Sequence, residues 1–439
     1  MRNKRNVLTL FFIIFAVKAF AQFEISAELR PRFELNNGFG SVPTLDNEPT
    51  AYIAQRSRLN FTFNDSKYRL YVSLQDVRNW GDEDVASGSG AFANSGSFGI
   101  HQFWAEFSVS SNAIIKVGRQ EFKYDDQRLL SIRNWNQYGQ SYDAVLFSRK
   151  KNNWQFDLAV SYNNDNSKGE AAGFGSNTFD VDPITRRLRT LNFVYLKKQI
   201  SNSWSVSSTA LLTGYQKEKL SSTTYLMATY GLFTEYKSKG LEGRMNLYGQ
   251  SGKSQKGLDV NAFMYTAEAS YRKGKIRPGI GIDILSGNDG SNTDPGYKTT
   301  EHAFDVFYGV RYARYGFMNQ YVVPSSTLGG GLVDIYPQLH FYPDKKSRFT
   351  VDYHFFSLQQ KVKDTKNPEV FLSGSLGSEL DIVWHYNFSK ELFTTVGYSY
   401  YFTNDTFANI KKIDPEKIGK PYFVYVMLTF KPVLFRSGK

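Results

Sequence analysis

Residues 23–35, Phe-Glu-Ile-Ser-Ala-Glu-Leu-Arg-Pro-Arg-Phe-Glu-Leu, decide the fold of this chain. Apart from Pro31, odd-numbered positions carry apolar side chains, and even-numbered positions carry polar or charged ones. A period of two places the apolar side chains on one face of a β-strand and the polar side chains on the other. The stretch is also longer than the roughly 5 to 6 residues of an average strand in a soluble protein. It therefore predicts a long, two-faced strand.

The same alternation recurs along the chain, for example over residues 56–63, 68–75, 154–161, 263–272 and 379–388. Aromatic residues make up 16% of the sequence, which favours β structure because rings fit a pleated surface. The alternating segments approach or exceed the about 9 to 11 residues of a strand that spans a membrane. We expect an all-β protein whose apolar face meets lipid and whose polar face lines a lumen.

The connections between these segments fall into two sets, which alternate along the chain. Tight connections lie at 64–67, 110–112, 150–153, 200–203, 237–240, 273–274, 343–347 and 389–390. Long polar ones lie at 36–50, 80–98, 121–140, 163–186, 288–300, 361–375 and 404–420. Each tight turn closes a hairpin, and the segments 23–35 and 421–430 complete a total of 18 strands. The sequence predicts a transmembrane antiparallel β-barrel of about 18 strands with short periplasmic turns and long extracellular loops.

One segment, 301–316, alternates well enough to be a further strand. A nineteenth strand would break the even number of strands typical of a single-chain bacterial barrel, and Gly309, Gly316 and Pro324 are unfavourable inside a central strand. We therefore interpret 301–330 as a re-entrant or long loop. A barrel of 20 strands, in which 301–316 pairs with another segment, remains the alternative.

The N-terminus has the features of a secretory signal. Basic residues precede the apolar run 7–17, and Ala19-Phe20-Ala21 provides a cleavage motif. We predict a signal peptide at 1–21, an outer-membrane β-barrel at 22–439, and location in the cell outer membrane. The sequence has no cysteine, which excludes disulfides, thiolate nucleophiles, cysteine-bound zinc and N-terminal lipidation.

The polar face of the predicted strands carries many arginines. The candidates for the solute path are Arg30, Arg32, Arg56, Arg58, Arg69 and Arg244. Rings of arginine and lysine select anions in pores, and a guanidinium group binds a carboxylate through two hydrogen bonds. Acidic residues share the same face, so mutual neutralisation across strands is the alternative reading.

A second group of candidates follows Gly118. It contains cations, an aromatic ring and an acid: Arg119, Arg128, Arg133, Trp135 and Asp143. Aromatic rings stack on sugars, whereas amides and guanidinium groups bond to hydroxyl and acid groups. The alternative is a rim loop whose arginine and aspartate residues pair to keep it folded.

Several motifs resemble the alginate export family of outer-membrane proteins. They are GRQEFKYDDQRLL at 118–130, WNQ at 135–137, SYD at 141–143, DVFYG at 305–309, GLVD at 331–334, ELRPR at 28–32 and RSR at 56–58. The resemblance spans most of the chain and implies an 18-stranded barrel that passes an anionic polyuronate outward through an arginine-lined constriction.

By position, the resemblance carries this role to Arg30, Arg32, Arg56, Arg58, Arg119, Arg128 and Arg133. The later loop departs from the family pattern, because Arg311-Tyr-Ala-Arg314 replaces the usual His-Lys. This departure leaves the identity of the transported solute open.

The function predicted from the sequence is therefore a passive outer-membrane channel for an anionic polysaccharide or oligosaccharide. A general anion- or oligosaccharide-permeable porin for nutrient uptake is the alternative. The expected partners are an anionic glycan or other anionic solute, outer-membrane lipid and, on the periplasmic side, secretion proteins. Nucleic acid is excluded, because the chain is exported and its basic residues are dispersed.

We expect no enzyme activity, no cofactor and no metal site. The five histidines form no H-E-x-x-H motif and none lies beside a G-x-S-x-G motif. A hydrolase remains a distant alternative, since His354 with Asp352, and His385 with Asp381, share the inward face. The loop 287–294 has the oxygen-rich composition of a calcium site, but Asn, Asp and Gly are also ordinary turn formers.

Overall fold

The computed structural model describes residues 22–81, 98–163, 188–217, 223–306, 309–310, 312 and 314–437. Its antiparallel sheet closes into a barrel, because each barrel strand pairs with the next along the chain and β1 pairs with β19. Strands β14 (Thr300–Glu301) and β20 (Val433–Arg436) are short additions that pair with β12 and β1. The barrel itself has 18 strands, which confirms the predicted number and excludes the 20-stranded alternative.

The barrel strands are β1 Gln22–Asn37, β2 Thr50–Asn64, β3 Tyr68–Asn79, β4 Gly99–Ser110, β5 Ala113–Gln120, β6 Tyr142–Lys151, β7 Trp154–Val160, β8 Leu188–Ser201, β9 Trp204–Gln216, β10 Thr224–Ser238, β11 Leu241–Lys253, β12 Asp259–Tyr271, β13 Ile276–Leu285, β15 Leu332–Phe341, β16 Ser347–Ser357, β17 Ser375–Asn387, β18 Leu392–Phe402 and β19 Tyr422–Phe430. Helical turns lie in the loops at α2 Pro295–Lys298, η2 Ser325–Thr327, α3 Asp405–Ile410 and η3 Pro415–Lys417. Among the described residues, no helix is long and apolar enough to cross a membrane.

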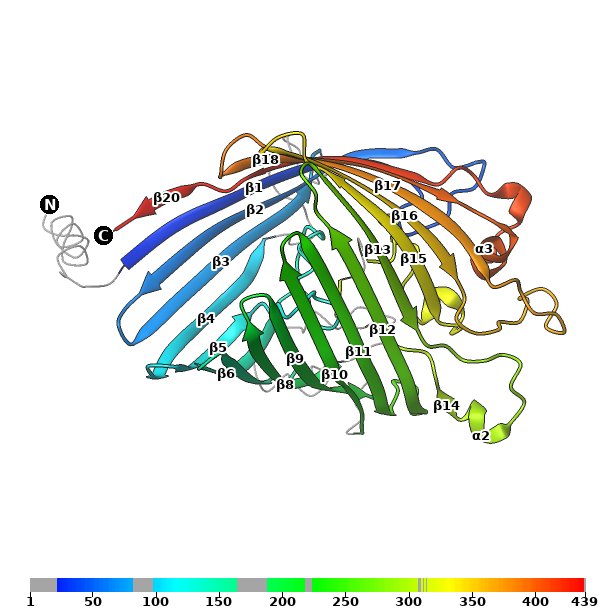
Figure 1. Cartoon of the computed structure of the whole chain (residues 1–439), viewed down its shortest axis with the longest axis horizontal. Helices are drawn as coiled ribbons and strands as arrows, with labels where there is room; N and C mark the ends of the chain where they lie inside the picture. The colour runs from blue at the N-terminus through cyan, green and yellow to red at the C-terminus, as the bar shows by residue number, and fades with distance from the viewer. Residues whose placement is uncertain are drawn as a thin grey trace, which may run out of the picture.

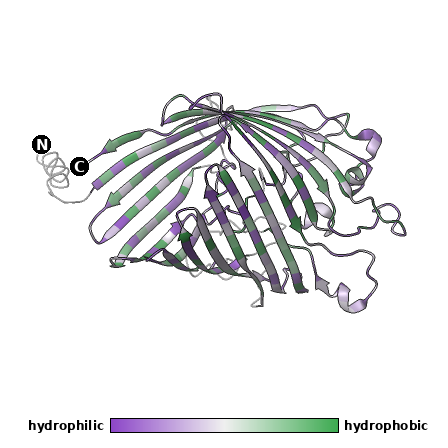
Figure 2. Ribbon diagram, in the orientation of Figure 1, coloured by the Kyte–Doolittle hydropathy of each residue, from purple (hydrophilic) through white to green (hydrophobic). Residues whose placement is uncertain are grey.

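The short turns and the long loops lie at opposite ends of the barrel. Figure 1 shows β20 and the start of β1 at one end and the helices α2 and α3 at the other. Figure 2 shows hydrophobic and hydrophilic residues alternating along the strands. On β11, for example, the side chain of Leu247 is exposed by 50%, whereas that of its neighbour Asn246 is exposed by only 1%. The apolar side chains therefore cover the outside of the barrel, as a lipid-facing wall requires.

The inner face is not uniformly polar. On β12 the inward residues near the short turns are polar, such as Thr266 and Ser270, whereas Val260 and Met264 near the long loops are apolar and buried. The reason is that two long loops fold into this half of the barrel. Their side chains, together with the inward apolar residues of the strands, form a hydrophobic core inside the lumen.

The first inward loop comprises residues 121–141 and the second residues 302–331, of which 307, 308, 311 and 313 lie outside the described residues. Phe122 and Leu130 of the first loop, and Phe304, Met318 and Tyr321 of the second, are almost completely buried. The extracellular half of the predicted lumen is therefore largely packed. The predicted signal peptide lies outside the described residues.

Candidate functional site

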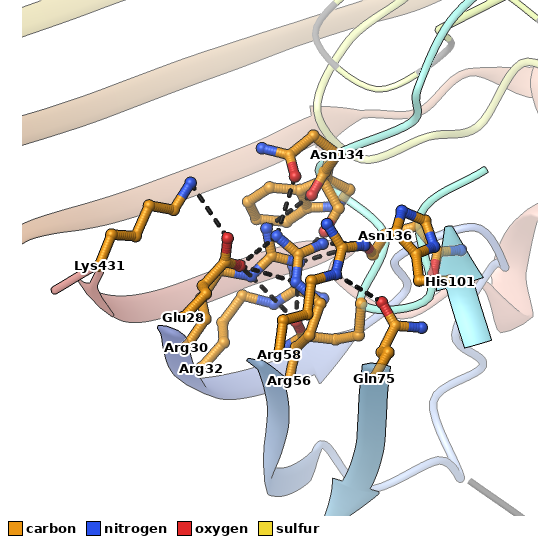
Figure 3. A network of polar contacts seen from close by, with 12 residues as sticks. Glu28, Arg30, Arg32, Arg56, Arg58, Gln75, His101, Asn134, Asn136 and Lys431 are labelled. Atoms are coloured by element: carbon orange, nitrogen blue, oxygen red, sulfur yellow. Dashed lines mark hydrogen bonds and ion pairs between the residues drawn. The ribbon is translucent and has the colours of Figure 1, made fainter. Parts of the chain in front are cut away.

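Four arginines, Arg30, Arg32, Arg56 and Arg58, project inward from neighbouring strands β1 and β2. The antiparallel register places Arg30 opposite Arg56, and Arg58 opposite Glu28. Figure 3 shows the four side chains gathered below Asn134 and Asn136 of the first inward loop. We call these four residues the arginine cluster. Alternation along two paired strands brings residues that are far apart in the sequence onto one face.

The first inward loop covers the arginine cluster with its own backbone. Arg30 donates to the carbonyl oxygens of Asn134 at 2.6 Å and Asn136 at 3.1 Å. Arg32 donates to the carbonyl oxygen of Trp135 at 2.7 Å. Since a loop inside a barrel has no sheet partner for its carbonyl groups, the guanidinium groups supply the missing donors. The arginine cluster therefore holds this loop in place.

Carboxylates neutralise only part of the charge of the arginine cluster. Arg56, which is completely buried, donates from two nitrogens to Oε1 of Glu28. Arg32 Nε donates to Glu34 Oε1 at 2.6 Å. Glu28 also forms an ion pair with Lys431 at 3.1 Å. The cluster therefore keeps a local excess of positive charge.

Unlike the other three arginines of the cluster, Arg58 donates no hydrogen bond to a carbonyl of the first inward loop within the described residues. Its Nε donates to Gln75 at 2.7 Å, and its Nη1 lies 3.9 Å from Glu121, which also contacts His101 at 2.8 Å. Its Nη2 atom is buried and has no hydrogen-bond partner among the described residues. A buried guanidinium nitrogen without an acceptor is costly, so this donor remains available for an acceptor.

A cavity of about 480 Å³ adjoins the arginine cluster. Its lining combines cations, an acid and aromatic rings: Arg32, Arg78, Arg133, Glu34, Phe39, Tyr52, Trp135, Tyr138 and Tyr312. Tyr138 is the most open of these rings for which an exposure is given, at 60%. Cations next to rings suit a solute that has both carboxylate groups and the apolar faces of sugar rings.

Arg128 fixes the first inward loop to the opposite wall. It donates to both carboxylate oxygens of Asp283 on β13, at 2.5 and 2.8 Å, and lies 3.3 Å from Asp126. Burial works to raise the pKa of the Asp126 carboxyl, but the charges of Arg314 and Arg128 lower it below its usual value. Burial works to lower the pKa of Arg128, but Asp283, together with Asp126 and nearby tyrosines, raises it well above its usual value. Arg128 is thus a charged anchor of the loop.

Trp135 joins the two inward loops. Its ring stacks on Tyr312 of the second loop with a centroid distance of 3.7 Å and an angle of 2°. The guanidinium group of Arg32 lies over the same ring at 4.1 Å. A backbone hydrogen bond of 2.9 Å from Val310 to Gln127 adds a second connection. The two loops therefore form one unit, and Trp135 is mainly a packing residue rather than an open platform for sugars.

Two further candidates lie apart from the arginine cluster. Arg69, at the start of β3 near the short turns, is exposed and lies over the ring of Trp104 at 5.4 Å. Arg244 on β11 donates to Glu235 on β10 at 3.0 Å, and both share the inward parity of Asn246. These residues face the periplasmic half of the lumen.

The prediction that Arg119 and Asp143 line the solute path is wrong. They pair with each other across β5 and β6 at 2.9 and 2.8 Å, with side chains exposed by 40% and 57%. Both have the parity of exposed Val117 and Val145, so they lie on the outside of the barrel. The alternation changes phase between segments, so a polar residue at a strand end is no proof of an inward position.

The predicted histidine pairs also differ from the structure. His354 contacts Asp334 of the neighbouring strand at 2.8 Å, and no hydrogen bond joins it to Asp352. His385 contacts Thr395 at 3.1 Å. Neither histidine hydrogen-bonds to its expected aspartate, and none of these contacts is to a serine.

Side chains of the loop 287–294 bond to nearby backbone groups, as turn formers do. Asp289 accepts from the backbone of Ser291 at 2.9 Å, and Asp294 from that of Gly296 at 2.8 Å. Within the described ranges, no group of three or more histidine, aspartate or glutamate residues could hold a metal ion.

Sequence reasoning missed what covers the arginine cluster. The polar residues 135–137 were expected to bind sugar, but their backbone and Gln137 bind arginines of β1 instead, with Gln137 accepting from Arg30 at 2.7 Å. The many asparagine and glutamine residues beside Trp135 were the available signal. The sequence does not show which side of the loop these residues face.

A closed 18-stranded barrel with an apolar outer wall, a charged inner wall and loops folded into the lumen defines an outer-membrane channel protein. The family model for alginate export matches residues 21–418, so the chain belongs to the alginate export family. The protein is therefore located in the outer membrane, and the family points to a channel rather than an enzyme.

Solved structures show the same fold at low sequence identity. Pseudomonas aeruginosa OccK5 (OpdH) has 12% identity over 94% of this chain and 98% of its own, with a TM-score of 0.57. P. aeruginosa OpdO has 13% identity, 94% and 98% coverage and a TM-score of 0.59. Acinetobacter baumannii OccAB1 has 14% identity, 96% and 99% coverage and a TM-score of 0.56. No curated protein sequence matched this chain.

Proposed function

We propose that the protein passes an anionic polysaccharide or oligosaccharide through the outer membrane by passive diffusion, and that the arginine cluster is the selective point of the path. The observation that carries the proposal is the inward guanidinium group of Arg58, whose Nη2 is buried without a hydrogen-bond acceptor. The cavity lined by Arg32 of the same cluster, which has three arginines and several rings, provides the matching surface on the loop side.

Passage requires the first inward loop to give up its bonds to the cluster. Its carbonyl groups are neutral acceptors, whereas the carboxylates of a uronate are charged. Charge-assisted hydrogen bonds are roughly twice as strong as neutral ones, and a carboxylate engages a guanidinium group at two points. An anionic solute therefore competes with the carbonyls of Asn134, Trp135 and Asn136 for Arg30 and Arg32, whereas a neutral solute does not.

The alternative is a general porin with a mild preference for anions. The half-exposed pair Arg244–Glu235 favours this reading, because it leaves the periplasmic part of the lumen with charges of both signs.

The test is planar-bilayer conductance of the refolded protein, with permeability ratios for anions and cations and block by polyuronate or by a neutral oligosaccharide. We expect anion preference and block by polyuronate alone. Arg58→Gln should weaken both, whereas Arg119→Gln, with the same charge change on the outside of the barrel, should leave both unchanged. Large unselective currents without block would favour the general porin.

A further inference from the structure

A pair of buried carboxyl groups lies on β17, which only β18 and β19 separate from β1 and the arginine cluster. Glu379 and Asp381 are inward residues of β17, with side chains exposed by 0% and 1%. They are successive inward residues of one strand, and they accept from the consecutive backbone amides of Met318 and Phe317, so the two carboxyl groups lie near each other. Glu379 Oε2 and Asp381 Oδ1 have no donor among the described residues. Two neighbouring carboxylates that are completely buried cannot both be ionised without a large electrostatic cost.

This pair holds the second inward loop. The backbone N–H of Met318 donates to Glu379 at 2.6 Å, and that of Phe317 donates to Asp381 at 3.2 Å. The Glu379 carboxylate lies where a Cβ on Gly316 would be, and Gly316 has a φ of +79°. Only glycine therefore lets the chain approach this closely. The segment 315–318 is consequently docked on the wall through two carboxyl groups.

The charged and titratable groups around the pair come from several elements. Asp334 of β15, Asp352 and His354 of β16, Tyr401 of β18, Asp283 of β13 and, from the loops, Arg128 and Tyr321 all lie nearby. His354 contacts Asp334 at 2.8 Å and lies 3.7 Å from Asp381. Arg128 is already engaged by Asp283. One histidine is thus the nearest cation to four carboxyl groups, so the wall has more acids than it can keep ionised.

We propose that Glu379 and Asp381 share one proton and that this proton keeps the second inward loop docked in the lumen. In the docked state the proton bonds one carboxyl to the other, and each carboxyl also accepts one backbone N–H of the loop. At alkaline pH hydroxide removes the proton, the two carboxylates repel each other, and the segment 315–318 leaves the wall. The inference concerns gating and does not depend on which solute passes.

The test is the pH dependence of single-channel conductance in planar bilayers. For the wild type we expect a low conductance at neutral pH and a reversible, severalfold rise under alkaline conditions. Glu379→Gln keeps a neutral group that donates to Asp381 and accepts from Met318, so the rise should disappear. Glu235→Gln removes an ionisable carboxyl elsewhere in the lumen and should retain the rise.

Two further measurements keep the inference testable if Glu379→Gln does not fold. Gly316→Ala forces the segment away from Glu379, so conductance should be high already at neutral pH. Infrared spectra of the wild type should show a protonated carboxyl band that is lost on alkaline titration. A wild type without an alkaline rise, or Glu379→Gln with an unchanged rise, would overturn the proposal.

Discussion

The two walls of the lumen hold the inward loops by opposite chemistry. On the β1–β2 wall, guanidinium groups of Arg30 and Arg32 donate to backbone carbonyls of the first loop. On the β17 wall, carboxyl groups of Glu379 and Asp381 accept from backbone amides of the second loop. In both cases a segment without a sheet partner has its polar backbone groups satisfied by side chains of the wall. The barrel thus uses charge of either sign to keep a loop inside.

The difference lies in what can release each loop. Arginine keeps its charge at any ordinary pH, so a competing anion, and not a change of pH, should release the first inward loop from the cationic wall. Carboxyl groups gain and lose protons, so a change of pH should release the second inward loop from the acidic wall. We therefore expect the two walls to respond to different signals, although Trp135 and Tyr312 join the loops that they hold.

The largest effect should come from removing the cationic wall. In the double variant Arg30→Ala with Arg56→Ala, the first loop loses donors whose hydrogen bonds contribute about 1.5–3 kcal/mol each where a charged group is involved. We expect a severalfold higher conductance at neutral pH and a loss of anion preference, measured in planar bilayers. Arg119→Ala, which breaks an outside pair, is the control. Unchanged conductance in the double variant would show that the cluster does not restrain the loop.

The next largest effect should come from removing Arg128, which anchors the first inward loop to Asp283 of β13. Arg128→Ala leaves Asp283 buried without its partner, which typically costs about 3–5 kcal/mol of unfolding free energy. Arg244→Ala, in a half-exposed pair with Glu235, should cost only about 0–1 kcal/mol. Urea unfolding in lipid vesicles measures both. Equal losses would mean that Arg128 is not an anchor.

A smaller effect should report the coupling between the loops. The stacked rings of Trp135 and Tyr312 should show a coupling energy of about 0.5–1.5 kcal/mol in a double-mutant cycle of Trp135→Leu and Tyr312→Leu. The same vesicle unfolding measurement provides it. Additive effects of the two substitutions would separate the loops into two independent units and remove the link between the walls.

The smallest effect concerns Lys411, which lies just after α3 and binds the second inward loop. Its Nζ donates to the carbonyl oxygen of Gln320 at 2.7 Å. Burial lowers the pKa of Lys411 from 10.5 to about 8. Because the folded state binds this proton less tightly than the unfolded chain, stability should rise as pH increases from about 8 to 10.5. In Lys411→Met this rise should be reduced, whereas exposed Lys412→Met should keep it.

Much of the fold could be predicted from local patterns. Alternation over residues 23–35 predicted β1, and tight turns such as 273–274 gave the number of strands. These features depend on near neighbours in the chain and on the contrast between lipid and water. The arginines of β1 and β2 were identified for the same reason, because spacing by two along paired strands fixes their face.

The rest of the candidate site depends on contacts between distant residues. Nothing in the sequence near Trp135 shows that its carbonyl meets Arg32, or that Met318 meets Glu379. Arg119 was misplaced because membership of a polar group and of a family motif does not tell which face of β5 a residue occupies.

The sequence by itself determined a closed barrel of 18 strands with an apolar outer face and arginines on the inner face of β1 and β2. Only the tertiary structure decided that two loops fill the extracellular half and that two nearby parts of the wall hold them with charges of opposite sign. The physical reason is that alternation is a local response to lipid and water, whereas a loop inside the lumen takes its position from buried polar groups that must find partners far along the chain.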